Sequence, residues 1–163
     1  MQQRDPIQTA KLAASVDQVS NGRFLFGVGA AGTGMKWRTT GTVFESRFKA
    51  MRERTEAMRE IWTKSKAAYH GDMVDFPELM TWPKPVQKRY PPILVGGGFP
   101  QAARRAIRYG DGWCPFGRTG SSLLDVLGQY RQMARDAGRD PETLPVTSSI
   151  RPRMRANSPA IAT

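Results

Sequence analysis

Cysteine, histidine and long apolar runs are scarce in this chain of 163 residues. The single cysteine, Cys114, cannot form an internal disulfide, and with one histidine, His70, a structural zinc site is excluded. The longest apolar runs, such as residues 24–26 and 93–95, are far shorter than the ~20 residues of a membrane span. The N-terminal MQQRDPIQTAK lacks the apolar region of a secretory signal. We therefore expect a cytoplasmic protein without a membrane span.

Acidic residues are also few, since 14 Asp and Glu stand against 25 Lys and Arg, which gives a net charge of +11. A basic domain of this kind can bind nucleic acid. The cations are scattered along the chain, however, and a GC-rich coding bias toward arginine explains them equally well. We therefore disfavour a nucleic-acid partner, and keep a non-catalytic basic binding or structural protein as the alternative to an enzyme.

The remaining composition is that of a folded domain. Hydrophobic residues make up 39% of the chain and charged residues 24%, so a packed core can form. The length suits one domain, which we place at residues 1–150. Residues 151–163 follow neither helical nor strand periodicity, and we predict a disordered basic tail there.

Helical and strand patterns alternate along this domain. We predict helices over 6–20, 43–62, 100–109 and 122–138, strands over 23–29, 93–95, 112–116 and 145–150, a hairpin over 68–76 and an extended loop over 77–92. Strands that alternate with helices pair in parallel through right-handed crossovers. The sequence therefore predicts an α/β fold with about four parallel strands. The apolar strand over 23–29 is expected to be buried on both faces.

Two of the predicted helices carry clear local signals. Asp5 can cap the first helix, with Pro6 in its first turn and Asn21-Gly22 as a left-handed stop. In the second helix, apolar residues recur at steps of three, four or seven, which predicts packing in the core. They are Phe44, Phe48, Met51, Met58, Ile61 and Trp62.

A first glycine motif follows the strand over 23–29. Gly27, Gly29 and Gly32 match the GxGxxG pattern of dinucleotide-binding folds. No helix opens at that turn, and no second strand with an acidic end follows at the required distance. An NAD site is therefore disfavoured, and a loop with close backbone approach is the simpler interpretation.

A second glycine motif is better placed. Gly96, Gly97 and Gly98 lie between a predicted buried strand and a predicted helix. Backbone N–H groups there can turn toward one point, and together with the helix N-terminus they suit a phosphate. An ordinary tight turn is the alternative.

Other reactive side chains are not placed for catalysis. His70 falls at the hairpin turn, where it is expected to be solvated. Cys114 lies between Trp113 and Pro115, which favours a small buried apolar role over a nucleophile. No Ser/His/Asp arrangement, metal-ligand cluster or close pair of carboxylates is recognisable, so catalytic residues stay unassigned and no metal is expected.

Several segments occur together in a consistent order. They are LAASVDQVSNGRFLFGVGA, AMREIW, YHGDMVDF, WPKPVQKRYPPILVGGG and GDGWCP. Over about residues 6–150 they resemble the luciferase-like flavin or deazaflavin oxidoreductases. This is a family of TIM barrels that includes bacterial luciferase-type monooxygenases and enzymes dependent on coenzyme F-420. The short spacing between PKP and PPI is most similar to the F-420-dependent subgroup.

The resemblance implies a partial TIM (β/α)8 barrel, because a whole barrel needs about 250 residues. It also implies FMN or coenzyme F-420 as cofactor and a small-molecule substrate. Cofactor binding is expected at the carboxyl ends of the strands, by Gly29, Ala30 and residues 96–98. We expect a truncated form with weak or no activity alone, unless a homo-oligomer or a second chain completes the barrel.

Overall fold

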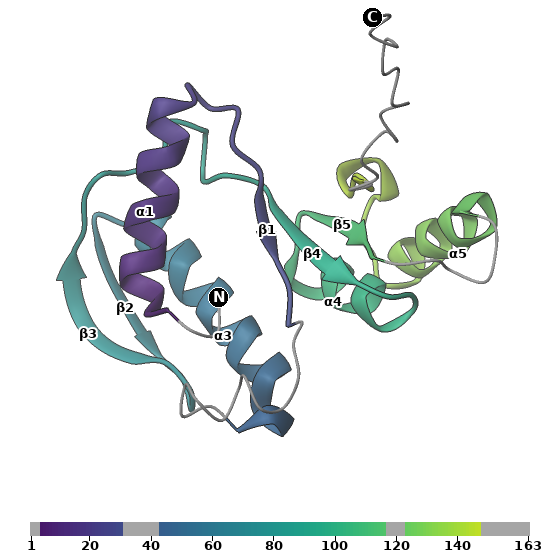
Figure 1. Cartoon of the computed structure of the whole chain (residues 1–163), viewed down its shortest axis with the longest axis horizontal. Helices are drawn as coiled ribbons and strands as arrows, with labels where there is room; N and C mark the ends of the chain where they lie inside the picture. The colour runs from purple at the N-terminus through teal and green to yellow at the C-terminus, as the bar shows by residue number, and fades with distance from the viewer. Residues whose placement is uncertain (1–3, 31–42, 117–122, 148–163) are drawn as a thin grey trace, which may run out of the picture.

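The computed structural model is built around a three-stranded parallel sheet (Figure 1). It describes residues 4–30, 43–116 and 123–147. The strands, in spatial order, are β1 (Phe26–Val28), β4 (Ile93–Gly97) and β5 (Gly112–Pro115). β4 pairs in parallel with both of its neighbours, as the alternation of helices and strands predicts.

The first residues of the fourth predicted strand, over 145–147, pair with β5. Val146 forms a parallel bridge with Trp113 of β5. The Trp113 N–H donates to the Pro145 carbonyl at 3.0 Å, and the Thr147 N–H donates to the Trp113 carbonyl at 2.9 Å. Residues 148–150 and the predicted tail over 151–163 lie outside the described residues.

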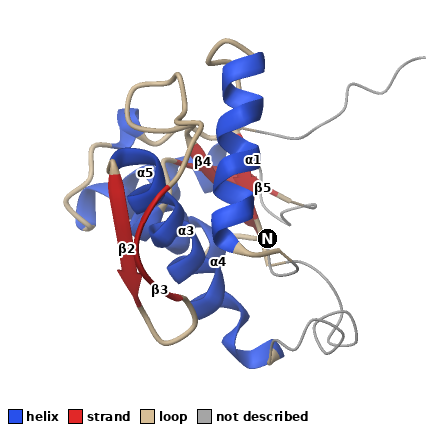
Figure 2. Cartoon of the chain, turned by 90° about the vertical axis from the view of Figure 1, so that its left-hand side faces the viewer, coloured by secondary structure: helices blue, strands red, loops and turns tan. Residues whose placement is uncertain are grey.

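Figure 2 shows the α-helices of the described chain beside the strands. The helices are α1 (Pro6–Val19), α3 (Arg47–Thr63), α4 (Gln101–Tyr109) and α5 (Leu123–Asp136). Short 3-10 turns occur at Phe44–Ser46 and Pro141–Thr143. α1 packs on α3, whereas α4 packs on β4 and β5.

The predicted start and end of the first helix are confirmed. The Asp5 side chain accepts a hydrogen bond from the Gln8 N–H at 3.0 Å. Asn21 and Gly22 follow the helix with φ angles of 52° and 73°, in the left-handed region that ends helices. These local signals needed no tertiary contact, which is why the sequence alone located them.

The core lies between the sheet and the helices. Ile93 and Val95 of β4 are completely buried against apolar residues of α3 and α4. Burial of β1 on both faces is a wrong prediction. Gly27 is exposed and the preceding Leu25 is 50% exposed, because β1 is an edge strand of the described sheet and the helices cover one of its faces.

The core prediction for the second helix holds for most of its residues. Those buried are Met51, Met58, Ile61 and Trp62. Phe44 and Phe48 are only half-buried, at the start of the helix. Periodicity identifies the apolar face of a helix, but it does not show where along that face the neighbouring elements end.

Strands β2 (Lys66–His70) and β3 (Asp75–Met80) form the predicted hairpin, which is separate from the parallel sheet (Figure 1). The buried Glu53 carboxylate of α3 accepts hydrogen bonds from the N–H groups of Met73, at 2.7 Å, and Val74, at 3.3 Å. This carboxylate ties the hairpin turn to the helix. β3 extends into the region predicted as a loop, and Pro77 is accommodated because β3 is an edge strand.

The WPKPVQ segment lies where the strands begin. The buried Asp17 carboxylate of α1 accepts hydrogen bonds from the backbone N–H groups of Val86, at 2.8 Å, and Gln87, at 3.0 Å. It also accepts one from the side chain of Gln87 at 2.7 Å. The Lys84 ammonium donates to two carbonyls at the end of α3. The segment thus holds the ends of α1 and α3 together, which is a structural role.

Candidate functional site

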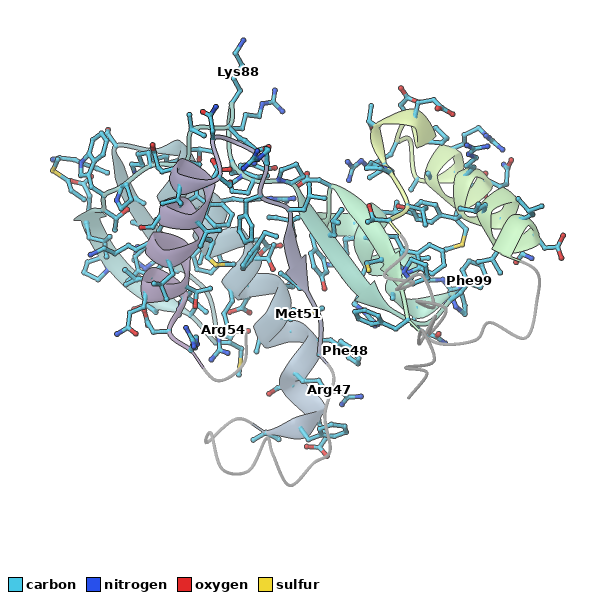
Figure 3. All side chains as sticks on the ribbon, turned by 45° about the horizontal axis from the view of Figure 1, so that its top comes forward. Arg47, Phe48, Met51, Arg54, Lys88 and Phe99 are labelled. Atoms are coloured by element: carbon cyan, nitrogen blue, oxygen red, sulfur yellow. The ribbon has the colours of Figure 1, made fainter. Side chains whose placement is uncertain are left out.

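The carboxyl ends of the parallel strands meet at one edge of the sheet, which we call the carboxyl edge. Gly29 and Ala30 follow β1 there, and Phe116 follows β5. The glycine run, defined as Gly96, Gly97 and Gly98, ends β4 and leads toward α4. Figure 3 shows Arg47 and Phe48 at the start of α3, at the end of the molecule opposite Lys88. The five residues predicted to bind the cofactor, namely Gly29, Ala30 and the glycine run, therefore all lie at the carboxyl edge.

The inner face of this edge consists of bare backbone covered by an aromatic ring. A Cβ on Gly96 would lie 2.3 Å from Cε2 of Phe116, and a Cβ on Gly29 would lie 3.8 Å from the same atom. Phe116 is itself 49% exposed. The ring thus lies where a side chain on Gly96 would otherwise be, and it offers a flat, partly exposed apolar surface.

Gly97 is required by its backbone. Its φ of 141° lies in the region that residues with a side chain rarely adopt. A Cβ there would also lie 2.9 Å from the Cβ of Ala102 on α4. Its carbonyl accepts a hydrogen bond from Nε1 of Trp113 at 3.0 Å. Gly97 therefore sets the tight passage from β4 toward α4.

Gly98 differs because the space beside it is open. A Cβ on this residue would meet no described atom within 4 Å. Its carbonyl accepts from the Ala102 N–H at 2.9 Å, which joins it to the first turn of α4. The helix has Pro100 as its N-cap residue and no side-chain cap. Open backbone next to an uncapped helix N-terminus fits a phosphate group, since both the N–H groups and the helix dipole favour an anion.

Sequence reasoning missed two charged residues at this edge, Arg47 and Arg105. Arg47 is the first residue of α3 and Arg105 is the middle residue of α4, and both contact the ring of Phe48. The sequence shows two arginines among many. Their proximity depends on α3 and α4 beginning at the same edge, which only the fold reveals.

The structure also places most of the other residues that the sequence analysis considered. His70 ends β2 on the hairpin, solvated as predicted, with Nδ1 2.7 Å from Oδ1 of Asp75. Cys114 lies on β5 and is half-buried, so it is less buried than predicted. Gly27 is part of β1, and Gly32 lies outside the described residues. Residues 31–42, where a dinucleotide-binding fold would need a helix to open, lie outside the described residues.

Two buried tyrosines are not suited to proton transfer near neutral pH. Burial raises the pKa of Tyr109 and of Tyr130 to about 12. Within residues 4–30, 43–116 and 123–147, no three His, Cys, Asp or Glu side chains are grouped to hold a metal. The same residues include no helix with the length and apolarity needed to cross a membrane.

Comparison with protein families gives one clear match. A family model described as luciferase-like monooxygenase matches residues 2–162. The F-420-dependent glucose-6-phosphate dehydrogenase of Amycolatopsis mediterranei is 30% identical over 131 residues, which are 76% of this chain and 38% of that protein. The FMNH2-dependent dimethylsulfone monooxygenase of Pseudomonas putida is 29% identical over 136 residues, which are 82% of this chain and 38% of that protein.

A solved structure agrees with these matches. An F-420-dependent secondary alcohol dehydrogenase, in complex with an F-420–acetone adduct, superposes with a TM-score of 0.74 and 25% sequence identity. The superposition covers 88% of this chain and 44% of that chain. The chain therefore spans less than half the length of the relatives it matches, and its α/β fold corresponds to part of a TIM barrel.

Proposed function

Because this chain belongs to the luciferase-like monooxygenase family, we propose that it forms the cofactor-binding edge of an oxidoreductase using coenzyme F-420 or FMN. The substrate is a small molecule. When bound, the flavin or deazaflavin ring supplies the redox chemistry, and the protein supplies binding and orientation. The cofactor phosphate binds at the glycine run, and Gly29 and Ala30 border the cofactor on the neighbouring strand.

The observation that carries this proposal is the open backbone at Gly98. The glycine run ends a buried strand, and α4 begins at Gln101, three residues beyond it, without a side-chain cap. A phosphate beside Gly98 would meet N–H groups and the positive end of the helix dipole without displacing any described side chain. Phe116, on the inner face of the same edge, provides an apolar surface for the rest of the cofactor.

Further strands are needed to enclose a cofactor ring. The described chain supplies β1, β4, β5 and the bridge at Val146, whereas a TIM barrel closes with eight strands. We propose that the remaining strands come from elsewhere in the same polypeptide, from a second copy, or from another chain. On this proposal, residues 1–163 alone have weak or no activity, and the cytoplasm is their expected location.

The proposal is tested by two ligands that share a ring and differ in the phosphate, namely FMN and riboflavin. We expect FMN to bind more tightly to the wild-type chain in a fluorescence titration. Gly98→Ala places a Cβ in the phosphate space and should weaken FMN binding by about 1–3 kcal/mol, or about 5- to 150-fold, while riboflavin binding is unchanged. Parallel titrations with F-420 show which cofactor is preferred.

Gly27→Ala is the matched control. A Cβ on Gly27 also meets no described atom within 4 Å, but this residue belongs to the GxGxxG pattern on β1. We expect it to leave the preference for FMN intact. Equal losses in Gly27→Ala and Gly98→Ala, or equal affinity of the wild type for FMN and riboflavin, would contradict the proposal.

The net charge of +11 favours one alternative, a basic binding protein without redox chemistry. In that case any preference for FMN over riboflavin would come from the net charge alone, and Gly98→Ala would leave it unchanged. The chain would also be retained on nucleic acid, with an affinity that falls steeply as the salt concentration rises.

A further inference from the structure

Two arginine side chains meet at one aromatic ring near the glycine run. The guanidinium carbon of Arg47 lies 4.4 Å from the centroid of the Phe48 ring, and that of Arg105 lies 3.9 Å from it. Arg47 is the first residue of α3, and Arg105 is in the second turn of α4. The ring therefore links the start of α3, where Figure 3 shows Arg47 and Phe48, to the middle of α4.

This arginine pair, Arg47 and Arg105, has no carboxylate partner among the described residues. Neither guanidinium takes part in a salt bridge there. Arg47 donates to the Phe44 carbonyl at 2.8 Å, whereas Nε of Arg105 is buried without a described hydrogen-bond partner. Segments 31–42 and 117–122, which continue the chain from the carboxyl edge, contain no Asp or Glu in their sequence.

The pair therefore carries uncompensated positive charge. Burial lowers the pKa of Arg105, Tyr109 opposes this shift, and the charge of Arg47 adds to it. Stacking on Phe48 offsets part of the repulsion, because the face of an aromatic ring attracts cations. An anion between or beside the two guanidinium groups would offset the remainder.

The position of Arg105 indicates where such an anion would bind. Its Nη2 atom lies 3.9 Å from the point that a Cβ on Gly97 would occupy. The guanidinium thus borders the glycine run on the side of α4, whereas Phe116 covers the opposite face at Gly96. A guanidinium at this place can direct two N–H groups at phosphate oxygens, which a single backbone amide cannot do.

Resting on the proposed function, we propose that Arg105 is the charged partner of the organic phosphate at the glycine run. Phe48 holds the Arg105 side chain by stacking, and Arg47 adds a second positive charge. The backbone of Gly98 and the start of α4 supply neutral donors, and the arginine pair supplies the charge that favours a phosphate over an uncharged group of the same size.

Arg105→Met is the variant that separates this role from helix packing. Methionine keeps an unbranched apolar stem against Phe48 but removes the charge and the N–H donors. Arg104→Met is the matched control, because Arg104 is exposed on the same helix and its replacement changes the net charge equally. Arg105→Lys keeps the charge without the planar fork.

The readouts are the affinities for FMN, F-420 and riboflavin, the ³¹P NMR shift of inorganic phosphate, and the melting temperature. We expect Arg105→Met to weaken binding of the phosphorylated cofactor about 10-fold or more, with riboflavin unchanged. Arg104→Met should change it less than about 2-fold, because an exposed charge is screened by solvent. Arg105→Lys should retain more affinity than Arg105→Met.

Failure of this inference and failure of the proposed function give different results. If the wild type binds FMN and riboflavin equally, the proposed function fails and the arginine assignment fails with it. If the wild type prefers FMN and Arg105→Met keeps that preference, only the arginine assignment is overturned. Equal losses in Arg105→Lys and Arg105→Met, together with equally lowered melting temperatures, would assign Arg105 to packing and would also overturn it.

Discussion

Asp17 offers the sharpest test of how the chain holds its helices together. Its carboxylate is 0% exposed and accepts three hydrogen bonds from residues 86–87, at 2.7–3.0 Å. Hydrogen bonds to a charged group contribute about 1.5–3 kcal/mol each, but these donors lie in a partly exposed segment that water can reach after the change. Asp17→Ala should therefore lower the free energy of unfolding by about 3–5 kcal/mol.

Asp17→Asn refines this prediction. Its single carbonyl oxygen can still accept from the two backbone N–H groups, so the loss should be about 1–2 kcal/mol. Asp136→Ala is the control, because Asp136 is exposed on α5 and its replacement should cost less than about 0.5 kcal/mol. Urea unfolding followed by circular dichroism measures all three. A loss below about 1 kcal/mol for Asp17→Ala would refute the reasoning.

Two further predictions concern stability. Lys84→Met removes the ammonium that caps the end of α3, and should lower the melting temperature by about 2–6 °C, measured by calorimetry. Tyr130 is neutral and buried, with a pKa raised to about 12, so the unfolded chain ionises first as the pH rises above ~10. Its contribution to stability is thus present below pH ~10 and is lost between ~10 and 12. Tyr130→Phe should remove that loss, as denaturant unfolding at pH 9 and 11 would show, and unchanged alkaline sensitivity would contradict it.

Much of the fold followed from local signals in the sequence. The cap at Asp5 and the stop at Asn21-Gly22 act within one turn, and the structure places them as predicted. The parallel sheet followed from the alternation of elements. The predicted burial of β1 was wrong, because the number of covered faces depends on which elements surround a strand and not on its own residues.

The candidate site was only partly predictable. Three successive glycines after a strand predict a tight, exposed backbone that could approach a ligand, and Gly97 does adopt a positive φ. The role of Asp17 was hidden because its partner Val86 lies 69 residues away in the sequence. The arginine pair was hidden for the same reason. A charge becomes informative only when the fold shows that no opposite charge accompanies it.

The central claim is that the carboxyl edge binds the phosphate of a flavin or deazaflavin cofactor. It is tested most directly by amide NMR shifts of the ¹⁵N-labelled chain with FMN, compared with those caused by riboflavin, since weak binding is still visible in such spectra. We predict that the difference between the two ligands is confined to Gly97, Gly98, the first turn of α4 and Arg105. A difference centred on the segment 81–92 at the opposite edge, or no difference at all, would contradict the account.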